Sequence, residues 1–321
     1  MKWRTKVEIG QGADPIDYQD EVLVLGSCFA DHLGDKLSYY QFRHLANPFG
    51  VLFHPIPLGH LIERAIKGTH FREDDLFEHE GLWRCLEVHS RVAGTSKEAT
   101  REGMNQALRA FQKSLTQATH IVLTLGTAFA FRNLDQDLLV ANCHKLPQQQ
   151  FRRELTPVAG LIRSLARTVA VIREINPECQ ILMTVSPVRH VRDGLVENQR
   201  SKAHLIAAVH QIVEGANIHY FPAYELLMDE LRDYRFYKRD LIHPTEQAVD
   251  FVWEKFVEAW VDPGAIPLMK RVDAIRKQMA HRDVRATKPF RVAANESLKQ
   301  KAEALSAEYP FIHFDICDEF F

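Results

Sequence analysis

The sequence predicts a three-layer α/β/α sandwich built around a five-stranded parallel β-sheet. Five short apolar runs of strand length recur along the chain, and stretches with the helical spacing of apolar residues separate them. Turn-forming and small polar residues follow these runs. The carboxyl ends of parallel strands meet at one edge of a sheet, and ligands bind beyond that edge.

The first two strands are predicted by apolar runs with turn residues at their ends. Residues 21–25 form a run that stops at Gly26, and helical spacing follows through Leu37. Residues 41–45 form the second run, which stops in the turn Asn47–Gly50. We therefore expect a strand, a helix and a second strand in that order.

The same patterns continue along the chain. Further strands are expected at residues 120–125, 180–185 and 218–221. Further helices are expected at residues 57–67, 97–117, 156–176, 198–214 and 245–261. Two insertions interrupt the alternation: residues 82–88 predict an added strand, and residues 129–132 and 138–142 flank a polar turn and predict a hairpin.

The chain changes character after Val261, where Asp262-Pro263-Gly264 forms a break. We expect one domain over residues 1–261 and a helical C-terminal extension, residues 262–321, packed on that domain. The extension carries a basic stripe, which we interpret as a solvated face; a surface for an anionic polymer is the alternative. The stripe comprises Lys270, Arg271, Arg276, Lys277, Arg282, Arg285, Lys288 and Arg291.

Composition limits the class of protein. With 46% hydrophobic residues and a net charge of −2, the 321 residues require neither nucleic acid nor a membrane as partner. No apolar run reaches about 20 residues, and the N-terminus lacks a signal-peptide pattern, so we expect a cytoplasmic protein. The cysteines are odd in number and show no metal spacing, so we expect free thiols, no metal and no cofactor. They are Cys28, Cys85, Cys143, Cys179 and Cys317. The sequence does not determine the oligomeric state.

Two short motifs contain candidate catalytic groups. Gly26-Ser27-Cys28 places small nucleophiles between a strand and a helix, whose first N–H groups can hold an oxyanion and lower a thiol pKa. Asp240 and His243 are three residues apart, so the carboxylate can orient the imidazole as a general base. Pro244 suits a first helical position, which puts His243 at or near an N-cap. A plain strand-to-helix turn and a surface capping turn are the alternatives.

In this order the two motifs have the layout of the SGNH/GDSL esterases, and Gly26-Ser27-Cys28-Phe29-Ala30 matches the name-giving motif of the GSCFA family, a bacterial group in the SGNH-hydrolase superfamily. Further phrases that resemble the family are residues 47–50, 124–127, 140–145, 184–190, 235–237 and 240–244. The resemblance covers roughly residues 1–261. It implies a flavodoxin-like SGNH-hydrolase fold.

The resemblance also implies roles. The superfamily's Gly-Asp-Ser-Leu block puts Cys28 in the nucleophile's place, whereas Ser27 takes that role if the turn slips by one residue. Its general base and orienting acid correspond to His243 and Asp240. The third block's asparagine, an oxyanion donor, is replaced by Ala128. The expected donors are the backbone of Cys28 together with Gly50, Thr127 and Asn142.

Polar loop residues beyond the strand ends are candidate substrate ligands, with ordinary loop residues as the alternative. These candidates are Asn47, Gly126, His144, Ser186, Arg189 and His190. Lys145, next to His144, is open to the same two interpretations. Arg200, Ser201 and His204 lie near a helix start and are expected to be structural.

The expected function is hydrolysis or transfer of a small acyl group, such as acetyl on a carbohydrate, through a Cys/Ser–His–Asp site. The partner is then a small-molecule or carbohydrate ester. The alternative is an inactive SGNH-fold module that binds a carbohydrate or acyl ligand, which the replacement by Ala128 favours. A flavodoxin-like phosphate-binding regulator is disfavoured because the sequence has no Gly-rich phosphate loop.

Overall fold

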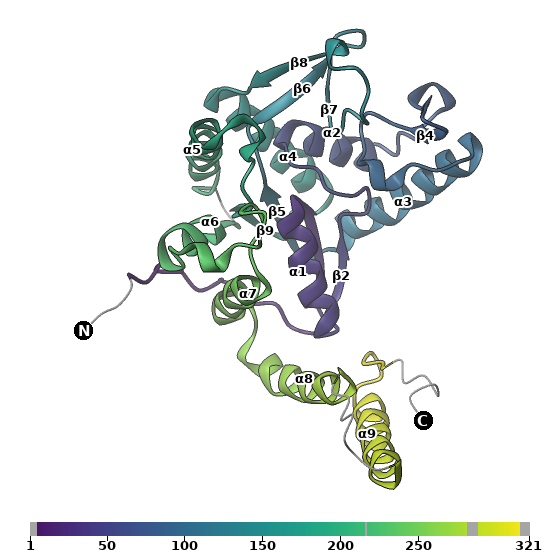
Figure 1. Ribbon diagram of the computed structural model, residues 1–321, viewed down its shortest axis with the longest axis vertical. Coiled ribbons are helices and arrows are strands. Elements are labelled where there is room, and N and C mark those ends of the chain that lie inside the picture. Colours follow the sequence, from purple (N-terminus) through teal and green to yellow (C-terminus); the bar gives the residue numbers. More distant parts are fainter. Residues whose placement is uncertain (1–4, 216, 281–287, 315–321) are drawn as a thin grey trace.

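A five-stranded parallel β-sheet lies at the centre of the protein, as the sequence predicts (Figure 1). The structure, a computed structural model, describes residues 5–215, 217–280 and 288–314. The strands are β1 (Glu21–Gly26), β2 (Arg43–Ala46), β5 (His120–Leu125), β9 (Gln180–Val185) and β10 (Ile218–Tyr220). Their order is β10-β9-β5-β1-β2. The order reverses between β1 and β5, so the crevice beyond their carboxyl ends is the switch point where such sheets bind ligands.

Helices cover both faces of this sheet. The main helices are α1 (Cys28–Tyr39), α2 (Pro55–Ile66), α3 (Lys97–Gln117), α4 (Val158–Ile175), α5 (Leu195–Ile212) and α7 (Glu246–Trp260). Side chains alternate along a strand, so Leu23 of β1 packs with α2 to α5, whereas Val22 and Val24 pack with α1 and α7. The three layers of the predicted sandwich are therefore present.

Shorter elements connect these helices and strands. Single turns of helix are η1 (Glu73–Asp75), η2 (Ser90–Val92), η3 (Gln148–Gln150), η4 (Val191–Asp193), η6 (Tyr234–Phe236), η7 (Pro263–Ala265) and α6 (Ala223–Glu225), which continues into a π-helical turn, η5 (Leu226–Glu230). One prediction at a helix start is wrong. The side chain of Thr245 accepts from Ala248 N and forms the N-cap of α7, so Pro244 precedes the helix.

Two small antiparallel sheets are inserted between the main elements. The first pairs β3 (Phe77–His79) with β4 (Leu82–Arg84), a shorter strand than the predicted 82–88. The second comprises β6 (Phe129–Asn133), β7 (Leu138–Val140) and β8 (Phe151–Leu155), in the order β7-β6-β8. It contains the predicted hairpin and adds β8. Because this insertion follows β5 directly, it lies beyond the carboxyl edge of the main sheet (Figure 1).

The C-terminal helices are α8 (Ile266–Ala280) and α9 (Lys288–Glu308), which lie at the end of the molecule away from β6 and β8 (Figure 1). Val272 and Leu305 are buried in the same apolar cluster as α1 and α7. Within the basic stripe, Arg271 pairs with Glu308 at 2.6 Å and Lys277 pairs with Asp273 at 2.8 Å. The stripe's residues 282 and 285, and Cys317, lie outside the described residues.

The segment before β1 runs along the chain that leaves α7. Ile16 donates to Trp260 O at 2.7 Å and accepts from Asp262 N at 2.9 Å, which forms a parallel bridge with Val261. This bridge joins the two ends of the sheet domain. None of the helices in the described residues is long and apolar enough to cross a membrane.

Candidate active site

The turn after β1 is shaped by the neighbouring strand β5. Gly26 has a φ of +122°, and a Cβ at this position would lie 2.1 Å from Thr124 O, so only glycine fits. Ser27 N then donates to Thr124 O at 2.9 Å. The turn thus places the first residues of α1 at the switch point between β1 and β5.

The two candidate nucleophiles of this turn face different environments. Ser27 is 1% exposed, and its Oγ accepts from Phe29 N at 3.2 Å and shares a hydrogen bond of 3.0 Å with Thr124 Oγ1. It is therefore an N-cap whose hydroxyl faces the interior. Cys28 begins α1, is half-buried and carries a free thiol. This geometry favours the register in which Cys28 is the nucleophile.

The Cys28 thiol is less acidic than the sequence predicts. Burial raises its pKa, and the nearby Asp31 carboxylate raises it further, whereas its own backbone N–H and Arg91 lower it. Burial and Asp31 outweigh the effect of the helix N-terminus, so the expectation of a lowered pKa is wrong. The resting group is a thiol, which needs a base at the moment of attack.

Asp240 and His243 form the hydrogen-bonded pair that their spacing predicts. Nδ1 of His243 lies 2.8 Å from Oδ2 of Asp240, and Oδ1 of Asp240 accepts from the backbone N–H of Ile242 and His243 at 2.9 and 3.0 Å. These bonds lower the pKa of the Asp240 carboxyl, so it stays ionised. Because Nδ1 is paired with Asp240, Nε2 is the nitrogen that can act as a base.

Arg189 secures the loop that carries this pair. Its backbone N–H donates to Ile242 O at 3.3 Å. Its guanidinium lies 3.9 Å from the ring centroid of Tyr237 and 5.3 Å from that of Tyr234. Leu241 has a φ of +58°, an unfavourable conformation for this side chain. Arg189 was expected among the substrate ligands, and its described contacts are with the His243 loop.

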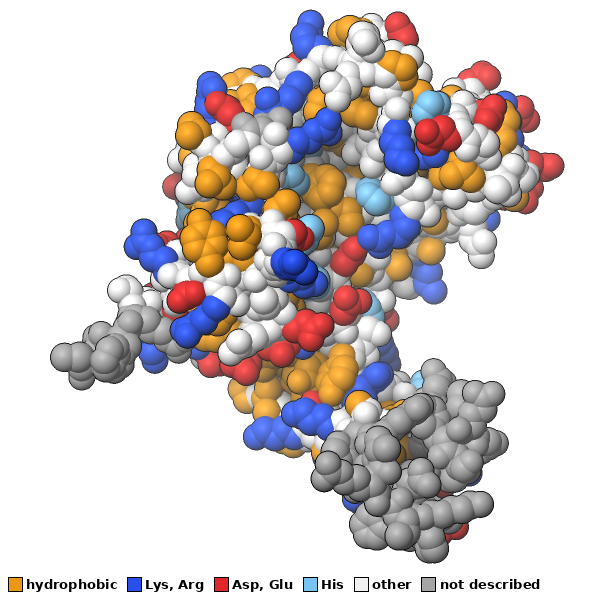
Figure 2. All heavy atoms as spheres, in the orientation of Figure 1, with side chains coloured by type: hydrophobic (Ala, Val, Ile, Leu, Met, Phe, Trp, Pro, Cys, Tyr) orange, Lys and Arg blue, Asp and Glu red, His pale blue; other side chains and the backbone are white. Residues whose placement is uncertain are grey.

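The His243 loop lies within electrostatic range of two other parts of the site. The charge of His243 contributes to lowering the pKa of His32, which is one turn from Cys28 on α1, after burial and Lys238. It also contributes to lowering the pKa of His190, which follows β9. His243 therefore lies near both α1 and the β9 loop. Figure 2 shows histidine and apolar side chains around a hollow on this face of the molecule.

Gly50 and Thr127, two of the predicted oxyanion donors, are engaged within the protein. The N–H of Gly50 donates to Asn47 O at 2.8 Å, and the N–H of Thr127 donates to Phe53 O at 3.2 Å. The Thr127 hydroxyl accepts from Phe129 N at 3.0 Å. The Asn142 side chain accepts from His144 N at 2.7 Å. Of the expected set, two donors remain. One is the backbone of Cys28, because the first N–H groups of a helix have no intrahelical acceptor, and the other is the side-chain amide N–H of Asn142, whose described bond uses only its oxygen.

Several predicted substrate ligands connect loops to one another. Asn47 accepts from Gly26 N at 2.8 Å and donates to Asp31 at 2.7 Å. His144 is 2% exposed and bonds Cys85 O at 2.6 Å, and burial lowers its pKa to about 4. Ser186 is fully buried, and its Oγ accepts from Val188 N at 3.3 Å. Of the six, Gly126 and His190 lie against each other: a Cβ on Gly126 would be 3.2 Å from His190 Nε2.

The sequence reasoning missed an ion pair beside Cys28. Arg91, from the insertion before α3, bonds Asp31 at 2.9 Å, and both affect the pKa of Cys28. Asp31 lies three residues after Cys28, a helical spacing that could have revealed it. Arg91 has no such signal because it is distant in sequence and close only in the fold.

The sequence reasoning also missed two buried polar residues in the first half of α5, Asn198 and Lys202. Lys202 is 1% exposed, and its Nζ donates to Gly126 O and Ser186 O, both at 2.7 Å. Burial lowers its pKa to about 7. Ser201 accepts from Ala128 N at 2.7 Å, and Asn198 accepts from His190 N at 2.8 Å. Ser201 is structural, as expected; Asn198 and Lys202 were not singled out.

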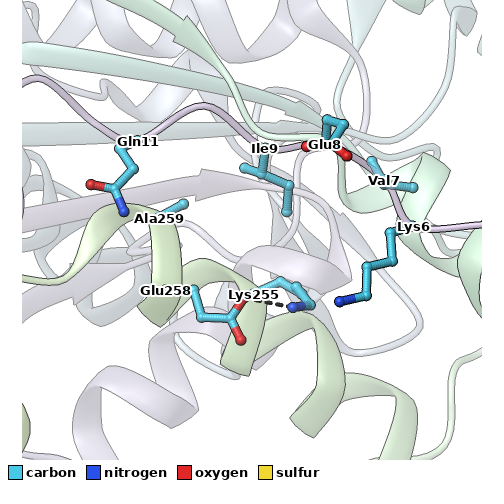
Figure 3. A pocket seen from close by; sticks show the side chains of 8 residues that line it. All are labelled: Lys6, Val7, Glu8, Ile9, Gln11, Lys255, Glu258 and Ala259. Atoms are coloured by element: carbon cyan, nitrogen blue, oxygen red, sulfur yellow. Dashed lines mark hydrogen bonds and ion pairs between the residues drawn. The ribbon is translucent and has the colours of Figure 1, made fainter.

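A cavity of about 250 Å³ lies away from these groups, between the N-terminal segment and α7 (Figure 3). It is lined by Lys6, Val7, Glu8, Ile9, Gln11, Lys255, Glu258 and Ala259. Its α7 residues are near the C-terminal end of a helix whose N-terminal end follows His243. Twelve residues of helix separate Glu246 from Glu258, about 18 Å along the axis. This cavity is therefore separate from the candidate active site.

No group of three or more His, Cys, Asp or Glu side chains within the described ranges is arranged to hold a metal ion. No curated protein matches the chain in sequence. The model of the GSCFA family matches residues 21–256, from the first residue of β1 into α7, and so includes both the Cys28 turn and the Asp240–His243 loop. The chain belongs to the GSCFA family.

Proposed function

We propose that the protein hydrolyses or transfers a small acyl group from an ester, with Cys28 as nucleophile and His243 as general base. The observation that carries this proposal is the Asp240–His243 pair, whose 2.8 Å bond through Nδ1 leaves Nε2 to accept a proton. The fold and the order of the motifs resemble the SGNH hydrolases, in which a nucleophile after the first strand is activated in this way.

The raised pKa of Cys28 determines how the nucleophile is activated. A thiol that burial and Asp31 keep protonated does not form a stable thiolate–imidazolium pair at rest. His243 therefore removes the proton as Sγ attacks the carbonyl carbon, as histidine does for a serine nucleophile. Asp240 stabilises the imidazolium that forms. The proton then passes to the leaving alcohol, and water or an acceptor hydroxyl releases the acyl group.

A carbohydrate is the favoured carrier of the acyl group. Tyr234 is 61% exposed and lies on the same side of the site as the His243 loop, since Arg189 contacts both the ring and the loop. An exposed aromatic ring beside a polar site offers a face for the apolar side of a sugar. Tyr234 therefore supports a sugar ester over a purely aliphatic one.

The test is hydrolysis of p-nitrophenyl acetate by the intact protein beside Cys28→Ala, His243→Ala and Ser27→Ala. We expect the first two substitutions to reduce kcat by at least about 10³-fold, because the nucleophile and its base act as a unit. Ser27→Ala should retain chemistry and lose about 1 kcal/mol of stability through the missing N-cap. Turnover that survives Cys28→Ala but not Ser27→Ala would reverse the assignment of the nucleophile.

The second candidate function is a binding module for a carbohydrate or acyl ligand. It is favoured by the engagement of the Gly50 and Thr127 N–H groups, which leaves the expected oxyanion hole incomplete. In that case the intact protein hydrolyses the ester no faster than buffer. It then binds acetylated sugars with an affinity that Cys28→Ala leaves unchanged, as calorimetry would show.

A further inference from the structure

The proposed acyl transfer leaves one position in its site unfilled. An oxyanion needs at least two donors aimed at it, and the backbone of Cys28 supplies one. Gly50 and Thr127 donate elsewhere through their N–H groups, and Ala128 has no polar side chain. Asn142 uses its side-chain oxygen to accept from His144 N, so a second donor comes either from its amide N–H or from the residues that follow β5 and β9.

His190 lies at the carboxyl edge of the main sheet, where β5 and β9 end. It follows β9, and its Nε2 is 3.2 Å from the position that a Cβ on Gly126 would take, at the end of β5. Its ring meets the edge of Phe53, with centroids 5.1 Å apart. Because β5 is hydrogen-bonded to β1, a ring that covers the end of β5 lies at the same edge of the sheet as the turn that carries Cys28.

The Nε2 atom of His190 is buried, and nothing in the described part of the chain hydrogen-bonds to it. A buried polar atom without a partner costs about 1–3 kcal/mol, so such atoms call for an explanation. The residue is not loosely placed, since Asn198 accepts its backbone N–H at 2.8 Å. A hydrogen-bond partner for Nε2 that arrives with the substrate would explain why this unsatisfied atom is present.

The electrostatics of His190 suit a donor and not a base. Burial, and then the charges of Lys202 and His243, lower its pKa to about 3. The ring is therefore neutral at physiological pH and binds protons too weakly to serve as a general base. A neutral imidazole carries one N–H. When the hydrogen is on Nε2, the imidazole can donate it to a group that arrives with the substrate. Gly126 keeps this position open, because any larger residue would carry a Cβ into the ring.

We propose that His190, as a neutral imidazole, donates Nε2–H to the oxyanion that forms when Cys28 attacks the ester carbonyl. In this step the Sγ–C bond forms, the thiol proton moves to His243 Nε2, and the carbonyl π electrons move to the oxygen that His190 and the Cys28 N–H receive. The bond to the alcohol then breaks, and the alcohol leaves with the proton from His243. This inference rests on the proposed function.

The experiment compares ester hydrolysis by the intact protein, Cys28→Ala, His190→Ala and His190→Gln, with His70→Ala as control. His70 is an exposed histidine far along the chain from the site residues. We expect His190→Ala to lower kcat by about 10²–10³-fold with KM nearly unchanged. His190→Gln should recover much of that loss, because a glutamine amide can place a donor near the former Nε2 position. The His70 variant should match the intact protein.

Two further readouts separate a donor from a structural residue. Inhibition by a trifluoromethyl ketone, which forms a tetrahedral adduct on Cys28, should weaken in His190→Ala in proportion to the loss of kcat/KM. His190→Ala should keep every limb of the intact protein's pH profile, whereas His243→Ala should lose turnover at every pH. A limb that disappears with His190 would assign the base role to His190 and overturn the inference.

The outcomes for the function and for the donor are distinct. Turnover that requires Cys28 but is equal in His190→Ala and the intact protein would reject the donor and leave the function standing. An intact protein without turnover above buffer would reject both. A third outcome is that His190→Ala loses activity, His190→Gln does not restore it, and the affinity for the ketone is unchanged. That outcome would reject the donor and show that His190 acts only in packing.

Discussion

The helices α4 and α5 lie side by side on the same face of the sheet, yet they bury different kinds of side chain. The inner face of α4 is apolar except for Thr168, with Leu161, Leu165 and Ile172 fully covered. The inner face of α5 begins with Lys202 and other polar residues and becomes apolar only from Leu205. The polar part lies where β5 and β9 end, so its side chains satisfy backbone groups that no longer have a neighbouring strand. The buried polar residues of α5 therefore lie at the carboxyl edge of this sheet, beside the candidate site.

The largest expected loss of stability comes from a substitution in the apolar inner face of α4. Leu165→Ala removes a fully covered side chain from α4 and should cost about 2–5 kcal/mol of unfolding free energy. Urea denaturation measures this cost, with the exposed Arg163→Ala on the same helix as control. Activity per folded molecule should be unchanged, because the residue is in the core and not at the strand ends. A loss below about 0.5 kcal/mol, the size of an ordinary surface change, would contradict the assignment to the core.

The next effect concerns a polar contact of α5. Ser201→Ala removes the acceptor for Ala128 N and leaves that buried donor without a partner, at a cost of about 1–3 kcal/mol. The change also loosens the loop after β5, so we expect kcat for the test ester to fall. Stability and activity should fall together, unlike for Leu165→Ala. Ala203→Ser, on the exposed side of the same turn, is the matched control.

The last effect, the smallest over a single pH unit, is the pH dependence that Lys202 produces. Its pKa is about 7 in the folded protein, against 10.5 for an ordinary lysine of the unfolded chain, so between these values the unfolded chain holds the proton more tightly. Stability should therefore rise with pH above about 7, by no more than about 1.4 kcal/mol per unit, and Lys202 should add no pH dependence below about 7. Lys202→Met should lose this rise, whereas the exposed Lys67→Met should keep it. Parallel pH curves for both variants would show that Lys202 stays charged.

Most of the main sheet could be predicted because its strands are buried on both faces and form continuous apolar runs. The helix at residues 97–117 was predicted to the residue, since Ser96 caps it and its apolar positions recur at helical spacing. The strand β8 was missed because Arg152, Arg153 and Glu154 occupy it, a composition typical of an exposed edge strand. A local sequence pattern identifies strands and helices that bury apolar side chains in the core. It overlooks strands that form only because a neighbouring strand pairs with them.

The candidate site was predictable where its chemistry is local in sequence. Asp240 and His243 meet because they share one turn, and the Cys28 turn follows from its strand and helix. The Gly50 N–H is taken up within the predicted turn Asn47–Gly50, whereas the Thr127 N–H depends on Phe53, which no spacing rule connects to it. The burial of His190 and Lys202 likewise depends on the whole fold.

The bridge between Ile16 and Val261 brings the start and the finish of the sheet domain to one place in the fold. A unit whose two ends meet can be carried within a loop of another protein without stretching the host. The same closure allows a circular permutant in which a short linker joins these ends and the chain opens at the exposed turn around Gln136. Modularity of this kind is a property of the connection between α7 and the N-terminal segment, and it is independent of whatever reaction the opposite edge performs.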